Sequence, residues 1–232
     1  MFKRFISVAC MLVIIFASVI LGRQATDISV LSSAVQSPQK TVILDAGHGG
    51  FDGGAVSADG TAEKDINLNI TLIVASILRQ DGYRVILTRE ADVSTDDVET
   101  EQIATRKKSD LKNRLALMND YPDGIFVSIH LNKFTTTAAR GAQVFYGPKN
   151  QNSKVLSDNI QGSIIKLLQP ENQRVCKKAT SSTYILYNAD IPAVLVECGF
   201  LSNKAELEKL KSEEYQAQMA FCIACGINEY YK

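Results

Sequence analysis

The chain has 232 residues with 25 basic and 25 acidic side chains, so its formal net charge at neutral pH is zero. This balance lacks the basic excess with which nucleic-acid-binding proteins attract phosphate backbones, and we therefore expect no nucleic-acid partner. Only two histidines occur in the whole sequence, so the position of each one is informative.

The first 22 residues form a distinct segment. Lys3 and Arg4 precede an uncharged apolar run from Phe5 to Gly22, and a run of this length is close to what spans a bilayer. The end of the run offers no small-residue motif that a signal peptidase would cleave. We interpret residues 1–22 as a hydrophobic anchor in the membrane, with a cleaved signal peptide as the alternative. The basic flank predicts that the residues after the run lie outside the cytoplasm.

Residues 23–40 are rich in Ser and Gln and show no hydrophobic periodicity, which is typical of a linker. The remaining residues, 41–232, are enough for one domain with its own core. Short runs in this part are apolar throughout rather than alternating with polar residues, which indicates strands buried on both faces of a sheet. These runs cover 41–47, 83–89, 124–130, 141–147 and 192–199.

Segments with helical periodicity lie between the predicted strands. In residues 63–82, branched apolar side chains recur every three or four positions, which predicts an amphipathic helix. Similar patterns predict helices at 151–169 and at about 203–230. The last of these would be capped by Ser202 or Asn203, and Glu206 fits a capping box with Asn203.

The stretch between the second and third predicted strands is less regular. Residues 109–119 predict a helix with Leu111, Leu115 and Met118 facing inward. Residues 92–108 are first acidic and then basic, and we expect a solvated loop or a frayed helix there.

The order of these elements predicts the fold class. Strands that alternate with helices are typical of an α/β domain, here a three-layer sandwich whose mostly parallel central sheet has helices on both faces. The run at 141–147 follows the run at 124–130 through a link too short for a helical crossover. We therefore expect this strand to be the exception and the sheet to be mixed.

Four residues that can bind a metal or transfer a proton should converge in this fold. His48, His130 and Glu197 each stand at the carboxyl end of a predicted strand, and the functional crevice of an open α/β sheet lies at that edge. Glu63 opens the helix after the glycine-rich loop around His48, so its side chain can point back toward that histidine. We expect all four side chains to share one site.

This set of residues suits a catalytic zinc ion, which takes three protein ligands from histidine and carboxylate and leaves one position for water. His48, Glu63 and His130 supply such a set. Glu197 then remains as the carboxylate that takes a proton from the water and passes it to the leaving nitrogen.

The glycine-rich loop, DAGHGGFDGG at 45–54, also raises the question of phosphate binding. Asp52 occupies the third glycine position of the dinucleotide fingerprint, and both Asp45 and Asp52 would repel a phosphate, so this interpretation is disfavoured. In the zinc interpretation the glycines make room for the substrate. The two aspartates are then candidates for orienting a histidine through a hydrogen bond.

Each of the four residues also has an explanation that involves no metal. A histidine at a strand end is often a satisfied polar residue, and Glu63 in a first helical turn complements the helix dipole. Glu197 is harder to explain in this way, because a carboxylate in an apolar strand is costly unless it is paired or binds a metal. Two histidines at equivalent strand ends, in a chain with no others, favour the metal interpretation.

The cysteines offer a second hydrolytic mechanism. Cys198 could act as a nucleophile with His130 as its base, but successive strand residues point to opposite faces. If Glu197 faces the crevice, Cys198 faces a helix layer. Cys222 and Cys225 lie three positions apart in an apolar helical segment, and we expect core residues there rather than a disulfide or a metal pair.

Four motifs surround the candidate residues: ILDAGHGGFDGG, a glutamate before KDINL, VSIHLN and VLVECGFLSN. In this order, over about 41–230, the sequence resembles the zinc-dependent N-acetylmuramoyl-L-alanine amidases of the type 3 family. Sheets in this family are largely parallel with helices on both faces. The resemblance implies that His48, Glu63 and His130 bind one zinc ion per chain and that Glu197 is the catalytic glutamate.

The resemblance also implies a substrate, a location and partners. The family cleaves the amide bond between the lactyl group of muramic acid and L-alanine in peptidoglycan. A bare catalytic domain behind an N-terminal hydrophobic segment is similar to the germination-specific amidases of spore formers, which remove stem peptides from spore cortex so that muramic-δ-lactam can form. This similarity implies an extracytoplasmic protein, anchored or secreted, in the forespore intermembrane space. A sporulation lipoprotein is a candidate activator, because some clostridial members need such a partner.

Two positions depart from the family pattern. After His130 the sequence reads LNKF where relatives often have Ala-Asn-Ala, and Tyr187 stands where many relatives have arginine. Both departures concern substrate contacts and leave the implied ligands unchanged. The alternative function is a catalytically silent peptidoglycan-binding or regulatory domain, because a fold alone does not establish activity. Retention of all four site residues argues against it.

Overall fold

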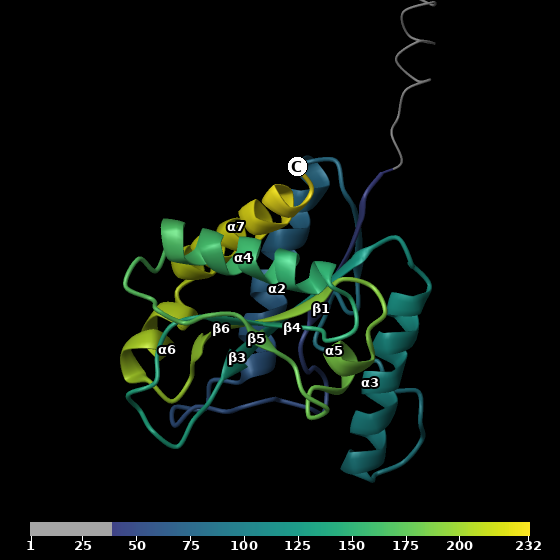
Figure 1. Ribbon diagram of the computed structural model, residues 1–232. Helices are drawn as coiled ribbons and strands as arrows, with labels where there is room; N and C mark the ends of the chain where they lie inside the picture. The colour runs from purple at the N-terminus through teal and green to yellow at the C-terminus, as the bar shows by residue number, and fades with distance from the viewer. Residues whose placement is uncertain (1–38) are drawn as a thin grey trace, which may run out of the picture. The chain divides into compact units, whose positions relative to one another are not determined.

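A computed structural model describes residues 39–232 (Figure 1). The anchor predicted at 1–22 lies outside the described residues, as does all of the predicted linker at 23–40 except its last two residues. Within residues 39–232, no helix has both the length and the apolar character needed to cross a membrane.

Six strands form one mixed sheet in the order β2-β1-β3-β6-β4-β5. Strands β1, β2, β3 and β6 pair in parallel, whereas β4 runs antiparallel to β6, which confirms the exception predicted from its short link to β3. The short edge strand β5 pairs with β4 in parallel, and no sequence pattern predicts it. The strands are β1 (Thr41–Ala46), β2 (Arg84–Leu87), β3 (Ile125–Asn132), β4 (Gln143–Tyr146), β5 (Lys177–Lys178) and β6 (Ala193–Phe200).

Helices cover both faces of this sheet, so the three-layer prediction is confirmed (Figure 1). Val42 and Leu44 of β1 enter a large apolar core with α2, α4 and α7, while Ile43 enters a smaller core with α3 and α5. This division follows from the alternation of side chains along a strand. The helices are α2 (Glu63–Gln80), α3 (Ile103–Asn119), α4 (Asn152–Leu167), α5 (Tyr184–Asn188), α6 (Lys204–Lys211) and α7 (Glu213–Tyr230).

Helix α3 begins at Ile103, earlier than the start predicted at residue 109. The acidic segment before it folds back along its basic side. Asp96 pairs with Arg106 at 2.8 Å, and the Ser109 hydroxyl donates a hydrogen bond to Asp97 at 2.6 Å. The change from acidic to basic residues at 92–108 therefore reflects a segment and a helix that pair with each other.

The inward face of α3 is partly polar. Met118 is fully buried and Leu115 packs against the smaller core, as predicted, but Leu111 is 36% exposed, so its predicted inward position is wrong. Asp110 and Arg114 are buried instead. Hydrophobic periodicity does not predict this face, because charged residues are rarely buried unless they are paired.

The C-terminal segment forms two helices, α6 and α7, rather than the one predicted. Ser212 ends α6 and caps α7 through its side chain. Asn203 caps α6 as predicted, and its side chain accepts hydrogen bonds from two amides of the first turn. Glu206 does not complete the capping box, because its carboxylate accepts from the amides of Gly141 and Phe200 instead.

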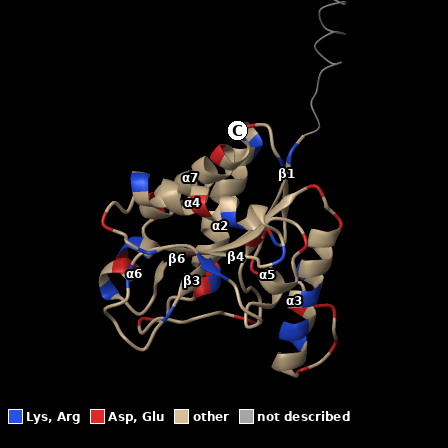
Figure 2. Ribbon diagram, in the orientation of Figure 1, with Lys and Arg blue, Asp and Glu red and all other residues tan. Residues whose placement is uncertain are grey.

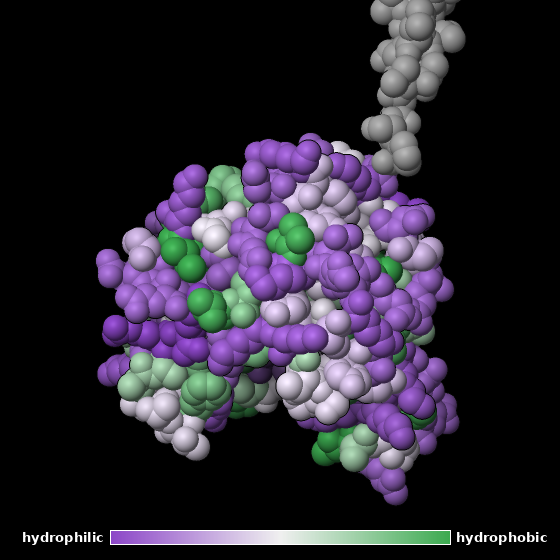
Figure 3. Space-filling model, in the orientation of Figure 1, coloured by the Kyte–Doolittle hydropathy of each residue, from purple (hydrophilic) through white to green (hydrophobic). Residues whose placement is uncertain are grey.

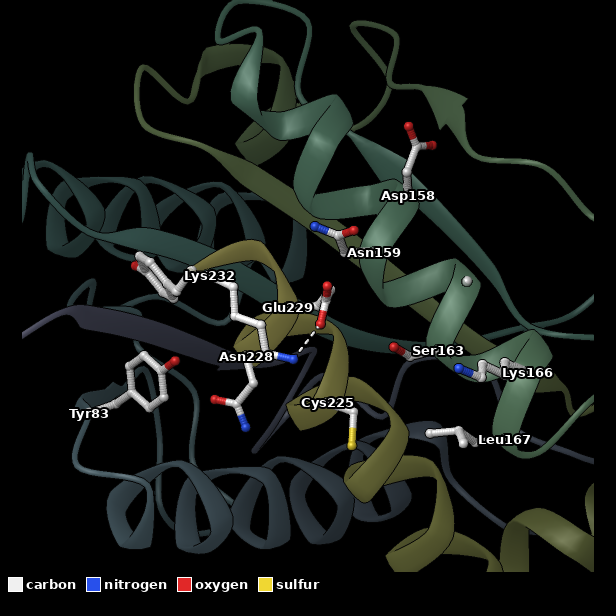
Figure 4. A pocket seen from close by; sticks show the side chains of 12 residues that line it. Tyr83, Asp158, Asn159, Ser163, Lys166, Leu167, Cys225, Asn228, Glu229 and Lys232 are labelled. Carbon is white, nitrogen blue, oxygen red and sulfur yellow. Dashed lines mark hydrogen bonds and ion pairs between the residues drawn. The ribbon is translucent and has the colours of Figure 1, made fainter.

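A cavity of about 850 Å³ lies between α4 and α7 (Figure 4) and is lined in part by Tyr83, Tyr231 and Cys225. Tyr83 precedes β2, and the Tyr231 hydroxyl donates to the carbonyl oxygen of Thr41 at the start of β1. This cavity is therefore at the amino ends of the strands, away from the predicted site. Cys225 is only partly buried there, whereas Cys222 is a buried core residue, and both are free thiols.

Close packing of α7 on α4 depends on a glycine. A Cβ atom at Gly226 would lie 2.5 Å from the Cα atom of Ile160, so we expect Gly226→Ala to lower the free energy of unfolding by roughly 1–3 kcal/mol through overpacking. The matched variant Gly162→Ala, where a Cβ atom meets nothing within 4 Å, should raise it by up to about 1 kcal/mol through helix propensity. Urea denaturation followed by circular dichroism measures both, and equal effects would contradict the packing argument.

Candidate metal centre

The site is built around the loop that follows β1. His48 has a φ of 63°, in the left-handed region, and no other described non-glycine residue has a positive φ. This conformation costs a residue with a Cβ atom roughly 1–2 kcal/mol. The next two residues, Gly49 and Gly50, also have positive φ angles of 131° and 56°, so the chain turns sharply here. Such strain is typically found at functional sites.

The structure brings His48, Glu63 and His130 together. The Nε2 atom of His48 lies 3.3 Å from Oε1 of Glu63, and the Nδ1 atom of His130 lies 3.0 Å from the same oxygen. Each residue offers one ligand atom, and these three atoms lie within 4.8 Å of one another. The three side chains therefore form a possible metal site at the carboxyl edge of the sheet.

The Glu63 carboxylate is fixed in position by the surrounding backbone. The residue is 3% exposed, and its Oε2 atom accepts a hydrogen bond from the amide of Ala55 at 2.8 Å. Its Oε1 atom accepts another from the amide of Leu131 at 3.0 Å. Because Leu131 follows His130 on β3, the same carboxylate joins the start of α2 to the end of that strand.

The charges at this centre depend on one another. Burial by itself lowers the pKa of His48, but hydrogen bonds to Asp52 and Glu63 raise this pKa to about 9 overall. Burial raises the pKa of Glu63, yet hydrogen bonds to both histidines hold it well below its usual range. The site therefore favours positive charge next to the Glu63 carboxylate.

Glu197 lies on the neighbouring strand, where the register of β6 sets it opposite His130 of β3. Two positions earlier, Leu195 packs in the smaller core, so strand alternation directs Glu197 to the same face. Its Oε2 atom is buried and has no hydrogen-bond partner among the described residues. Burial raises the pKa of Glu197 to about 7, against the opposing effect of the nearby histidines. A carboxyl group with such a pKa can both accept and donate a proton near neutral pH.

Cys198 takes no part in this site. The residue is fully buried in the larger core, on the face of the sheet opposite to Glu197. Burial raises the pKa of its thiol far above the usual value, so a reactive thiolate is disfavoured. A cysteine mechanism with His130 as the base finds no support in this geometry.

Of the two aspartates suggested for orienting a histidine, Asp52 contacts one. Its Oδ2 atom lies 2.9 Å from Nδ1 of His48, and its other oxygen pairs with Lys107 of α3 at 2.8 Å. The carboxylate also accepts a hydrogen bond from the amide of Gly54 at 3.2 Å. Asp52 therefore holds the ring of His48 and closes the loop at the same time.

Asp45 supports the loop in a different way. Its carboxylate accepts hydrogen bonds from the hydroxyls of Thr88 and Ser128, at 2.8 and 2.5 Å, and from the guanidinium of Arg114 at 2.5 Å. The expectation that this residue orients a histidine directly therefore needs correction. A buried aspartate beneath the loop instead anchors a buried arginine that contacts the loop.

Sequence analysis did not identify the two arginines that hold this loop. Arg89 and Arg114 are 3% and 2% exposed. Together they donate hydrogen bonds to the backbone carbonyls of Ala46, Gly47 and His48. These contacts to the loop are made to backbone atoms far away in the sequence, so no spacing pattern points to them.

A cavity of about 240 Å³ opens beside the two histidines, and Lys107, Leu111 and Ile185 contribute to its walls. Basic residues are frequent on α3 next to it (Figure 2). Figure 3 shows the lower edge of the molecule hollowed between α3 and the loops on the side of α6. The site is thus open to a ligand from the carboxyl edge of the sheet, with apolar and basic groups on one wall.

Comparisons with known proteins agree with this arrangement. The family described as N-acetylmuramoyl-L-alanine amidase matches residues 42–229. The chain is 35% identical over 192 residues to the germination-specific N-acetylmuramoyl-L-alanine amidase of Bacillus subtilis. The matched region covers 83% of this chain and 80% of that protein.

Solved structures show the same relationship. The CwlD amidase of Clostridioides difficile, solved in complex with the GerS lipoprotein, is 43% identical, with a TM-score of 0.80 over 83% of this chain and 98% of that one. The catalytic domain of CwlV from Bacillus (Paenibacillus) polymyxa is 32% identical, with a TM-score of 0.68 and the same coverage of 83% and 98%. The chain therefore belongs to the N-acetylmuramoyl-L-alanine amidase family.

Proposed function

We propose that this amidase uses zinc to hydrolyse the bond between N-acetylmuramic acid and L-alanine of peptidoglycan. The observation that carries the proposal is the set of three ligand atoms from His48, Glu63 and His130 within 4.8 Å of one another. Glu197, whose buried Oε2 atom has no partner among the described residues, lies on the adjoining strand. A non-catalytic role would leave this unpaired carboxylate without an explanation.

The donor set fits zinc in type, and the distances from Glu63 to the two histidines are close to those of a zinc site. Two imidazoles and one carboxylate are ligands of catalytic zinc sites, and bonds of about 2.0–2.1 Å in a tetrahedron separate the donor atoms by roughly 3.3 Å. The nitrogen atoms of His48 and His130 lie 3.3 and 3.0 Å from the shared oxygen of Glu63. Asp52, hydrogen-bonded to the other nitrogen of His48, is the kind of partner that fixes the orientation of a metal-binding histidine.

The residues of the chain then have separate roles in the reaction. Zinc, when bound by His48, Glu63 and His130, would act as a Lewis acid and lower the pKa of water. Glu197 accepts a proton from the attacking water and donates a proton to the nitrogen of the leaving L-alanine amine. Burial raises the pKa of this carboxyl above its ordinary value, and a catalytic acid or base works best when its pKa is near the ambient pH.

Removal of one proposed ligand tests the metal site. We expect about one zinc ion per wild-type chain and none in Glu63→Ala, because the carboxylate is the group that both histidines contact. The matched control is Asp65→Ala, which removes an exposed acidic residue from the same helical turn and should retain zinc. Elemental analysis of the purified chains gives the answer, and zinc retained in Glu63→Ala would argue against this ligand set.

A neutral replacement of Glu197 separates metal binding from proton transfer. Glu197→Gln should keep zinc and lose activity on peptidoglycan by about 100- to 10,000-fold, the range for loss of a general acid–base. Cys198→Ala, a change on the opposite face of β6, should retain activity. Full activity in Glu197→Gln would exclude its proton-transfer role, and glycan binding without peptide release in the wild type would favour the non-catalytic alternative.

We further propose spore cortex as the substrate and the forespore intermembrane space as the location. Similarity to the germination-specific amidase of Bacillus subtilis and to the GerS-bound amidase of Clostridioides difficile supports this assignment. A hydrophobic segment at 1–22 would keep the protein at the membrane, and a sporulation lipoprotein would be its activating partner.

Cortex composition tests this assignment in the organism. Deletion of the gene should remove muramic-δ-lactam from cortex peptidoglycan, because the lactam forms only where the stem peptide has been cleaved. Mass spectrometry of digested cortex measures the lactam, with wild-type and Glu197→Gln complementation as the matched pair. Unchanged lactam in the deletion strain would speak against the cortex role while leaving the amidase activity intact.

A further inference from the structure

Two buried side chains outside the proposed ligand set, Arg89 and Asn67, donate hydrogen bonds to the same backbone carbonyl, that of Gly47. Arg89 follows β2 and is 3% exposed. Its Nε atom donates to the carbonyl of Ala46 at 2.9 Å, and its Nη2 atom donates to the carbonyls of Gly47 at 3.1 Å and Lys64 at 2.8 Å. One guanidinium therefore bridges the loop of His48 and the first turn of α2, which begins with Glu63.

The surroundings of Arg89 are unusual for a buried cation. All its hydrogen bonds in the described structure go to backbone carbonyls, the last of them to Ala91 at 3.0 Å. Burial and the neighbouring Arg114 lower the pKa of Arg89, against the opposing effect of Asp45, Asp92 and Asp110. A buried charge without a directly bonded carboxylate is costly, so its value to the protein lies in the backbone that it holds in place.

Asn67 acts on the same loop from the side of α2. This residue is fully buried one helical turn after Glu63. Its Nδ2 atom donates to the carbonyl of Gly47 at 3.2 Å and to Oε1 of Glu63 at 3.3 Å. Its Oδ1 atom is buried with no partner among the described residues. The amide therefore contacts the site through its donor group while its acceptor is left unpaired.

Gly47 connects these contacts to every proposed ligand. The residue precedes His48 in the chain, and its carbonyl accepts from both Arg89 and Asn67. A Cβ atom at Gly47 would lie 2.3 Å from the ring of His130, so this backbone supports that ring directly. Movement of Gly47 would thus shift His48, its neighbour in the chain, and His130, whose ring it contacts. Asn67 also links the Gly47 carbonyl to Glu63, because its amide donates to both.

We propose that Arg89 and Asn67 are positioning residues that hold Gly47, and through it the three ligands, in the geometry that binds zinc. The inference rests on the proposed zinc site and adds residues outside the ligand set that hold the ligands in place. Arg89 and Asn67 would then have two effects. Like many core residues, they stabilise the fold, but unlike a core residue elsewhere, they would also raise the affinity for zinc.

Zinc affinity measured apart from stability tests the proposal. The full-length chain and the variants Arg89→Met and Asn67→Ala are titrated with zinc against a competing chelator, at a temperature where circular dichroism shows each to be folded. We expect each variant to bind zinc about 10- to 100-fold more weakly, the usual loss when a group that supports a metal ligand is removed. Arg89→Lys should be as weak as Arg89→Met, because an ammonium cannot reproduce the rigid fork of a guanidinium.

A core variant far from the site provides the matched control. Leu156 is fully buried in α4, and Leu156→Ala should lower the melting temperature with no change in zinc affinity. Wild-type affinity in a folded Arg89→Met or Asn67→Ala chain, or in Arg89→Lys, would overturn the positioning role alone. A wild-type chain that binds no zinc would overturn the proposed function and this inference together. If Arg89→Met does not fold, Asn67→Ala, which removes only a neutral amide, still decides the question.

Discussion

The buried ion pair between Arg114 and Asp45 is the interaction on which the rest of the site depends. Arg114 reaches from α3 to the end of β1, where it pairs with Asp45 and donates to the carbonyl of His48 at 2.7 Å. Its other partner, Asp110, lies one turn earlier on the same helix. Removal of Arg114 would leave Asp45 buried without a cation, at a cost of several kcal/mol, whereas removal of Asp45 would leave Arg114 paired with Asp110 alone. The position of α3 and the strained backbone of His48 are therefore determined together.

The larger elements and the residues of the candidate metal site could be predicted because each leaves a local signal. Apolar runs mark strands buried on both faces, and the carboxyl ends of such strands meet at one edge. That rule is enough to bring His48, His130 and Glu197 near each other. Glu63 could be added because it opens the helix that follows the loop.

The parts that could not be predicted depend on contacts between distant segments. The inward face of α3 is held by charge pairing. Hydrophobic periodicity therefore predicts too short a helix and places Leu111 on the wrong face. Arg89 donates to the carbonyls of residues 46, 47, 64 and 91. Since every residue has a backbone carbonyl, the sequence does not indicate such contacts. The sequence position of Asp45 suggests a hydrogen bond to a histidine, and only the fold shows that Arg114 pairs with this aspartate.

The place of β6 in the sheet has a consequence for the order in which the site can form. This strand is the last in the chain, yet it lies between β3 and β4, and it carries Glu197. Until the C-terminal part has been synthesised and inserted, the centre of the sheet is incomplete, and the carboxylate is absent from the histidine pair. A chain that ends before β6 therefore has neither the central strand pairing nor the carboxylate opposite His130, so the candidate site can form only after nearly the whole domain is available.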